Sequence, residues 1–263
     1  MYDIHSTLFG RRAALALIGG AALLASMPLN AAKPLTLAEV IRRNTRARGG
    51  VAALDRIRSV LFDVEIHEGG QTLNGRYAAD KRGLVKVDIY ADGKYAGGEG
   101  IDSAGVWTTG KNGPEPSVAK GAANALQHGA EDKLYGWHRF AERGHKLTLM
   151  PPQMIDGVTY QVVEIRYSTG HVSYFYVDPV SWQAVRRRDE RAFHPDVDQT
   201  QQNVESIYSD FQKVDGVVAP HADTDVDLAT GKVLATHPVL RRKINPDLPA
   251  DYFDRSRKAP PTW

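Results

Sequence analysis

The spacing of apolar side chains between residues 36 and 48 predicts an amphipathic helix. Leu37, Val40 and Ile41 recur at the three- and four-residue spacing of one helix face. Thr36 and Glu39 stand three residues apart at the start of this stripe, which is the spacing of a capping box at a helix N-terminus. A helix of this kind buries its apolar stripe against a second layer, so the sequence also requires a partner for it.

A glycine pair at residues 49–50 ends the predicted helix, because glycine adopts the left-handed backbone conformation that many helix ends use. After a second short helix, apolar residues recur at every second position, which is the period of a strand with one buried face. The residues on that face are Val60, Phe62, Val64 and Ile66. A second glycine pair, at residues 69–70, then supplies the turn of a β-hairpin.

Short alternating segments joined by turn residues continue to residue 241 and predict about ten or eleven strands. Residues 95–105 are rich in glycine, residues 111–116 are expected to form a loop, and residues 117–140 lose the alternation and are expected to be helical. Because most strands follow one another at hairpin spacing, the sheet should be antiparallel. The expected strands cover residues 60–66, 71–78, 84–90, 106–109, 146–150, 160–167, 172–177, 183–190, 204–211, 217–227 and 232–241.

These elements predict one domain of the α+β class, a single strongly curved antiparallel sheet in the form of a half-barrel wrapped around helices. Its expected bounds are residues 33–255, and residues 256–263 are expected to form a loose C-terminal tail. The length of 263 residues, of which 42% are hydrophobic and 24% charged, fits one globular domain of this kind.

The first 32 residues are expected to form a signal peptide rather than part of the fold. Arg11-Arg12 precede an apolar run from residue 13 to residue 25, and alanine at positions 31 and 32 offers a cleavage site. The run is shorter than the about 20 apolar residues that span a membrane, although an uncleaved N-terminal anchor is an alternative. The sequence therefore predicts a periplasmic protein that is not integral to the membrane, exported by the Sec or the twin-arginine route.

The absence of cysteine excludes disulfides, thiol nucleophiles and thiolate metal sites. Residues 1–31 contain two of the 33 basic and one of the 31 acidic residues, so 31 basic and 30 acidic residues remain without them. This near-neutral balance argues against a nucleic-acid binder. It favours a partner that is neutral or amphiphilic.

Four polar residues alternate along one predicted strand and therefore share a face: His221, Asp223, Asp225 and Asp227. They could hold a hard cation, or His221 with Asp223 or Asp225 could serve a hydrolase. The solvated outer face of an antiparallel sheet shows the same pattern, and we expect that structural role. The motifs HExxH and GxSxG and a phosphate-binding loop are absent, so we expect no catalytic residue, no metal and no cofactor.

Two further segments carry charge or aromatic side chains on a predicted strand. Arg186-Arg187-Arg188 is expected on a solvated strand edge, with contact to anionic lipid or a partner as the alternative. Tyr174-Phe175-Tyr176 places aromatic rings on both faces of one strand. The concave side of a curved sheet is then either an apolar cavity or a core filled by helices, and the sequence leaves both open.

Four segments also carry a family resemblance. The first is the helix that ends in ARGG at residues 47–50 and leads into an alternating strand; the others are DSAGVW at 102–107, SDFQKVDGVVAPH at 209–221 and NPDLPADYF at 245–253. Together they resemble the LolA/LolB lipoprotein-carrier family of periplasmic proteins, in particular its uncharacterised lipoprotein-sorting members. The motifs are structural, so the resemblance implies the half-barrel fold directly and a function by analogy.

The resemblance implies a carrier whose concave apolar face receives a lipid or a lipoprotein acyl chain while the helices act as a lid. Two alternatives remain, namely an envelope sensor or scaffold module that binds a protein partner, and the hydrolase or metal-dependent enzyme described above. By alternation, the residues expected to line the concave face are Val60, Phe62, Val64, Tyr77, Val87, Ile89 and Trp107, with Leu37, Val40 and Ile41 closing it.

Overall fold

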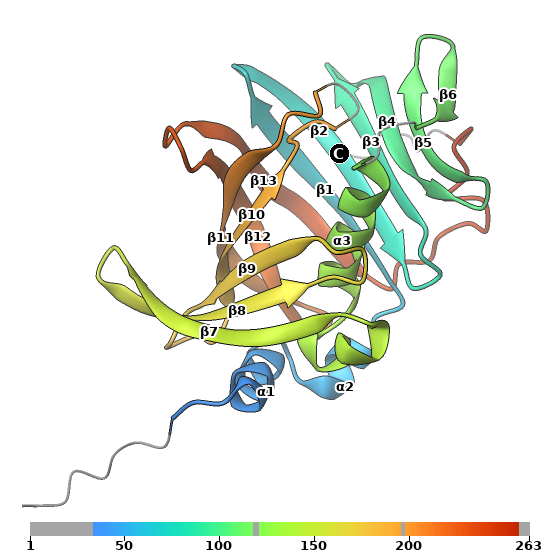
Figure 1. Ribbon diagram of the computed structural model, residues 1–263. Coiled ribbons are helices and arrows are strands. Elements are labelled where there is room, and N and C mark those ends of the chain that lie inside the picture. The colour runs from blue at the N-terminus through green and yellow to red at the C-terminus, as the bar shows by residue number, and fades with distance from the viewer. Residues whose placement is uncertain (1–33, 118–120, 196–197, 258–263) are drawn as a thin grey trace, which may run out of the picture. The chain divides into compact units, whose positions relative to one another are not determined.

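The computed structural model describes residues 34–117, 121–195 and 198–257 (Figure 1). From Leu35 onward the chain forms one compact unit. The expected signal peptide, residues 1–32, lies outside the described residues. Among the residues that are described, no helix is both long enough and apolar enough to cross a membrane.

Helix α1 spans Leu37–Ala47 and begins where the capping sequence predicts. The Thr36 hydroxyl accepts a hydrogen bond from the backbone N–H of Glu39 at 3.3 Å. The glycine pair 49–50 then takes positive φ angles of 116° and 87°, which end α1 and lead into helix α2, Val51–Asp55. The predicted helix, glycine break and second helix are therefore confirmed.

Thirteen strands form one open antiparallel sheet in the described part of the chain. Their order is β6-β5-β4-β3-β2-β1-β13-β12-β11-β10-β9-β8-β7, so β6 and β7 are its edges. The bounds are β1 Ser59–Glu68, β2 Gln71–Asp80, β3 Val85–Ala91, β4 Lys94–Asp102, β5 Gly105–Gly110, β6 Gly113–Pro116, β7 Lys146–Ile155, β8 Val158–Arg166, β9 Val172–Val177, β10 Ala184–Arg191, β11 Gln202–Val214, β12 Val217–Asp227 and β13 Val233–Ile244.

The thirteen strands exceed the predicted ten or eleven because the sequence does not reveal β4 and β6. β6 lies in the segment expected to be a loop, and β4 lies in the glycine-rich segment, whose residues are unfavourable in strands. The structure supplies a reason for one of these glycines. A Cβ at Gly100 would lie 2.3 Å from the Val85 carbonyl oxygen and 2.9 Å from Trp107 Nε1.

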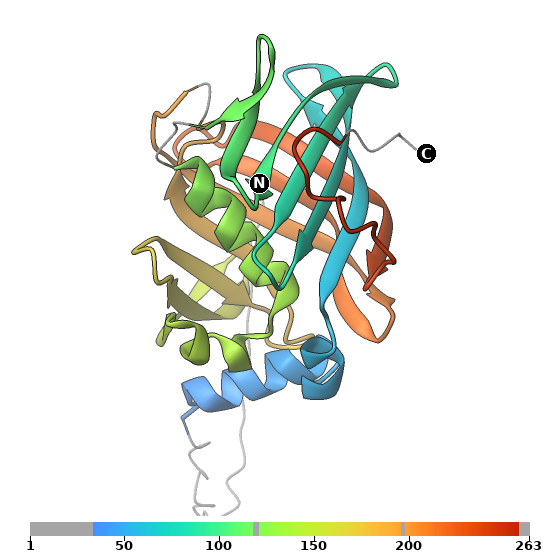
Figure 2. The same cartoon turned by 90° about the vertical axis from the view of Figure 1, so that its right-hand side faces the viewer.

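The chain passes from one edge of the sheet to the other through helix α3, Ala122–Leu134. Two short 3₁₀ helices follow, η1 Trp137–Arg139 and η2 Ala141–Arg143, before β7 begins. The two views show the sheet curving around α3, which lies along its concave side (Figure 1, Figure 2). We call this side the inner face; it carries Val60 and Phe62, and the opposite side is the outer face.

Two apolar clusters cover much of the inner face. The first packs Leu126 and Leu134 of α3, together with α2, against strands β1 to β3. The second packs Val40 of α1 with Trp137 and Phe140 against β8 and β9. The helices therefore fill both ends of the concavity.

The C-terminal segment packs on the outer face. The aromatic pair at residues 252–253 joins an apolar cluster with β1 and β2. Lys86 of β3 donates hydrogen bonds to the backbone carbonyl groups of Asp254 and Arg257. Ordered contacts thus extend two residues into the expected loose tail, and residues 258–263 lie outside the described residues.

Replacing Gly100 with alanine should lower the free energy of unfolding by about 1–3 kcal/mol, because the new Cβ would collide with a backbone oxygen. Chemical denaturation measures this change. The matched control is Gly97→Ala in the same strand, where the nearest atom would be 3.6 Å away. That variant should be as stable as the parent protein or slightly more so. Equal stability of the two variants would contradict the crowding at Gly100.

Candidate binding site on the inner face

Strand register places six of the predicted ligand-lining residues together on the inner face. Phe62 pairs with Tyr77, and Tyr77 pairs with Val87. Residues paired directly across antiparallel strands point to the same side of the sheet. Val64 and Ile89 both pair with Gly75 of β2, so their side chains also point to the same side. The six residues are Val60, Phe62, Val64, Tyr77, Val87 and Ile89; their contact with a ligand stays a prediction.

Trp107 lies on the outer face and does not line the concavity. It pairs with Gly100, and Gly100 pairs with Lys86, which is one residue away from the inward-facing Val87. The Trp107 side chain is fully buried against Gly100. Its placement from sequence was wrong because β4, the strand that sets its register, was not recognised there.

The three α1 residues expected to close the concave face all pack in or against the cluster that covers β8 and β9. Val40 is fully buried in the cluster that covers β8 and β9. Leu37 and Ile41 line a separate pocket of about 660 Å³, together with Trp137 and Leu147. Helix α1 therefore covers one end of the inner face through all three residues, and Leu37 and Ile41 also line the pocket beside it.

Several apolar side chains of the inner face lie outside the packed clusters, and we call five of them the apolar strip: Val64, Ile66, Leu73, Ile89 and Val239. Val64 pairs with Val239 of β13, and Ile66 pairs with Leu73 of β2. None of the five belongs to the four apolar clusters found among the described residues. All except Val64 are only half-buried. The strip is therefore apolar surface that the helices leave partly exposed.

Beside this strip the inner face is polar. Asp132 of α3 accepts a hydrogen bond from the Tyr167 hydroxyl at 2.7 Å and lies 3.8 Å from Arg187. Arg187 also lies 3.3 Å from Asp189. Burial raises the pKa of Asp132, and the arginine and the tyrosine hydroxyl oppose that rise. Asp132 thus connects α3 to a network of paired charges on the inner face.

The arginine triplet at residues 186–188 lies inside the sheet, not on the solvated edge expected from the sequence. It belongs to β10, which pairs with β9 on one side and β11 on the other. Arg186 and Arg188 form ion pairs with Glu205 at 3.1 and 2.7 Å. Arg187, between them, contributes to the polar network of the inner face. All three are committed to contacts within the fold.

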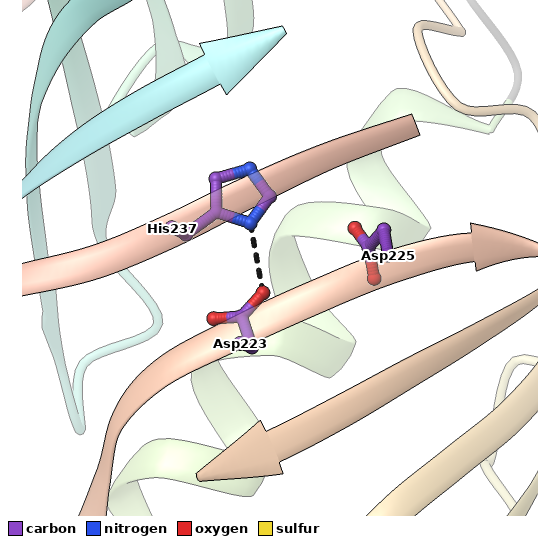
Figure 3. A group of neighbouring side chains, drawn as sticks. All are labelled: Asp223, Asp225 and His237. Atoms are coloured by element: carbon purple, nitrogen blue, oxygen red, sulfur yellow. Dashed lines mark hydrogen bonds and ion pairs between the residues drawn. The ribbon is translucent and has the colours of Figure 1, made fainter. Parts of the chain in front are cut away.

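Asp223 and Asp225 also face inward, which corrects the expectation of a solvated outer face. Asp225 pairs with Ser206, and Ser206 pairs with the inward-facing Arg187. Asp223 Oδ2 lies 2.8 Å from Nδ1 of His237 on the neighbouring strand (Figure 3). The alternation correctly placed the carboxylates on one face, but it could not tell which face the helices cover.

The histidine and carboxylates selected from the sequence do not assemble as expected. His221 Nδ1 lies 3.1 Å from the Ala219 carbonyl oxygen rather than against a carboxylate. His237 takes its place, because potential ligand atoms of Asp223, Asp225 and His237 all lie within 4.8 Å of one another. Three side chains this close together could bind a metal ion or form an ion network. The other contacts of these three side chains decide between the two.

Those contacts favour an ion network. Arg191 Nη2 lies 3.1 Å from Asp225 Oδ1, and the Ser206 hydroxyl donates to the same oxygen at 2.5 Å. A metal ion bound by this carboxylate would have to displace the arginine or share the carboxylate with it, and sharing would bring two cations together. The arrangement therefore suits a neutralised buried carboxylate better than a metal centre.

Three basic residues on the inner face were not singled out from the sequence, namely Arg48, Lys133 and Arg242. They follow α1, end α3 and lie in β13, and only the fold brings them together. For Lys133, the spacing of residues in the sequence does indicate a buried position. Lys133 stands seven residues, or two helical turns, after Leu126 and so shares the buried side of α3.

A solved structure of a LolA superfamily protein shares this fold. A LolA superfamily protein from Nitrosomonas europaea matches with a TM-score of 0.54 and 13% identity, over 85% of this chain and 99% of that chain. A DUF1329 family protein from Desulfovibrio piger (TM-score 0.45, 12% identity, 82% and 96% of the chains) and a putative outer membrane lipoprotein-sorting domain from Vibrio parahaemolyticus (0.42, 11%, 82% and 96%) also match. No protein-family model and no curated protein matches the sequence. The predicted LolA-like fold is confirmed.

The contact between His237 and Asp223 should raise the pKa of His237 above the 6.5 of an ordinary histidine. Burial lowers this pKa, but the hydrogen bond to Asp223 and the charges of Asp225 and Glu68 raise it more. The resulting stabilisation is complete below the unfolded pKa and is lost as the pH rises through the folded pKa. In an NMR titration, Asp223→Asn should move the His237 transition to lower pH. An unchanged transition would show that Asp223 does not set the charge of His237.

Proposed function

We propose that this chain is a periplasmic binding protein for a hydrophobic ligand, a lipid or a lipoprotein acyl chain, which lies along the apolar strip. The apolar strip carries this proposal, because its side chains lie on the concave side of the sheet and outside the clusters that the helices cover. The LolA-superfamily fold supports it by analogy alone.

The dimensions of the strip suit an alkyl chain. On β1 the strip adjoins the Phe62 ring, because the side chains of Phe62, Val64 and Ile66 follow one another on the same face. The ring and the strip together extend about 13 Å along β1 at about 3.3 Å per residue. A chain lying on this surface gains about 0.8 kcal/mol for each methylene removed from water. Affinity of this kind comes from burial, so it requires no catalytic or coordinating motif. That agrees with a sequence in which no such motif is found.

Replacing Ile66 with glutamine should weaken the binding of 1-monolaurin, a neutral single-chain amphiphile, about tenfold. The substitution keeps the side chain's size but puts a polar group on the strip, where the alkyl chain is expected to lie. Isothermal titration calorimetry with delipidated protein measures the affinity. The parent protein should bind monolaurin, and native mass spectrometry should detect the complex.

The control for this prediction is Leu240→Gln, which changes an apolar side chain of the neighbouring strand β13 that is 51% exposed. It should leave monolaurin affinity unchanged. Failure of the parent protein to bind monolaurin, or equal effects of the two substitutions, would refute a ligand site on the apolar strip.

A further inference from the structure

Three basic side chains lie near one another beside the apolar strip, since the charge of Arg48 acts on Arg242 and that of Arg242 acts on Lys133. We call them the cationic cluster: Arg48, Lys133 and Arg242. Each donates to backbone carbonyl groups. Lys133 Nζ lies 3.0 Å from the Gly129 oxygen, and Arg242 Nη2 lies 2.8 Å from the Pro220 oxygen. Arg48 contacts two carbonyl groups at the end of α3, at 3.3 and 3.2 Å. Within the described residues, none of the three has a carboxylate oxygen within 4.0 Å.

Two of these cations lie over a pair of stacked aromatic rings. The rings of Phe62 and Tyr77 are 4.7 Å apart, with 19° between their planes. Lys133 Nζ lies 4.9 Å from the centre of the Tyr77 ring, and Arg242 Cζ lies 4.9 Å from the centre of the Phe62 ring. Aromatic faces attract cations without neutralising them. The rings therefore hold both charges on the inner face but leave them without a counter-ion.

Two polar atoms of this region are buried and have no hydrogen-bond partner among the described residues: Arg242 Nε and the Tyr77 hydroxyl. Burial lowers the pKa of Lys133 to about 8 and that of Arg242 to about 10. Nearby positive charges add to this lowering, while Asp223 opposes it at both residues and Asp132 opposes it at Lys133. A buried donor left without an acceptor costs about 1–3 kcal/mol. An anion in contact with these groups would offset both the missing hydrogen bonds and the repulsion.

The nearest carboxylates are already engaged by other groups. Asp132 accepts from Tyr167 and lies beside Arg187. Asp223 is bound to His237. The cationic cluster is therefore short of negative charge, although it lies on a face that also contains paired charges.

The cationic cluster and the apolar strip are continuous. Arg242 pairs directly with Phe62 across the sheet, and Phe62 is followed on the same face of β1 by Val64 and Ile66. Lys133 and Arg242 are each half-buried, so neither residue is sealed off from the solvent. A molecule that contacts both features must combine a negative group with an apolar chain.

We propose that the cationic cluster binds the anionic headgroup, a carboxylate or a phosphate, of a single-chain amphiphile whose alkyl chain lies along the apolar strip. This inference rests on the proposed function and specifies its ligand class. The guanidinium of Arg242 presents a planar fork of donors that matches either oxyanion, and Lys133 adds a point charge. The Tyr77 hydroxyl supplies a further donor.

Four probes test the proposal by calorimetry on the delipidated full chain at one fixed salt concentration: 1-monolaurin, laurate, dodecyl phosphate and inorganic phosphate. At least one anionic amphiphile should bind tenfold or more tightly than monolaurin, and the tighter of the two identifies the headgroup. Equal affinity for neutral and anionic amphiphiles would overturn the headgroup site and leave the proposed function intact. If inorganic phosphate bound as tightly as dodecyl phosphate, the alkyl chain would add nothing to the affinity. That result would overturn the proposal that the ligand is an amphiphile. No binding of any amphiphile would refute the proposed function itself.

Substitutions locate the effect. Lys133→Met and Arg242→Met should each remove most of the preference for the anionic amphiphile and leave the affinity for monolaurin within about twofold. The matched control is Lys243→Met, the exposed neighbour of Arg242 that pairs with Leu61 on the outer face. It should keep the full preference. Loss of the preference in the control, or its retention in both inner-face variants, would overturn the assignment.

A pH series gives a test that needs no substitution. Since the pKa of Lys133 lies at about 8, the preference for laurate over monolaurin should decline as the pH rises above that value. Laurate itself remains ionised over this range, so only the protein's charge changes. A preference that stays constant from about pH 7 to about pH 10 would contradict a role for Lys133.

Discussion

The pairing of β1 with β13 is the constraint on which the rest of the structure depends. Every other pair of neighbouring strands in the described sheet is also consecutive in the sequence. The β1–β13 pairing instead joins Val60 to Ile244 and Glu68 to Ala235, across most of the chain. Closing so long a loop costs more entropy than forming a hairpin. It turns two meanders into one sheet, and the inner face exists as a continuous surface only because of it.

The same pairing creates the candidate site. Phe62 meets Arg242, and Val64 meets Val239, at this junction. Val239 and Arg242 are three residues apart, so regular alternation would point them to opposite faces. A register shift between Asp63 and Val64 inserts an extra residue in β13 and lets both face inward. The irregularity thus places an apolar side chain and a cation side by side on one surface.

Helix α3 divides the inner face between two kinds of chemistry. Its apolar residues, such as Leu126 and Leu134, pack against the strands at one end of the sheet. At the C-terminal end of α3, Lys133 lies over the aromatic pair of Phe62 and Tyr77, and Asp132 belongs to the polar network. A lysine in the last turn is stabilised by the helix dipole, which offsets part of the cost of its burial. One helix therefore serves as core and as a wall of the site.

The spacing of residues in the sequence correctly predicted the features that depend on neighbouring residues alone. The capping pair before α1, the period of β1 and the shared face of Phe62, Tyr77 and Val87 all follow from spacing. The errors arose where the face of a side chain depends on a neighbouring strand or on a helix packed over the sheet. Trp107 required the register of β4, and Asp223 required knowledge of the face that α3 covers. The site depends on the junction and its bulge, and neither leaves a periodic trace in the sequence.

The passage through α3 has a consequence for how the molecule could be divided. The chain crosses only once from the strands β1 to β6 to the strands β7 to β13, and it does so through the segment that contains α3. A break between β6 and α3 would leave two fragments, each with a complete meander. Their reassociation would rely on the β1–β13 hydrogen bonds and on the packing of α1 and α3, each against the opposite fragment. The architecture is thus suited to fragment complementation. Recovery of the folded protein from the two fragments would report directly on the β1–β13 pairing.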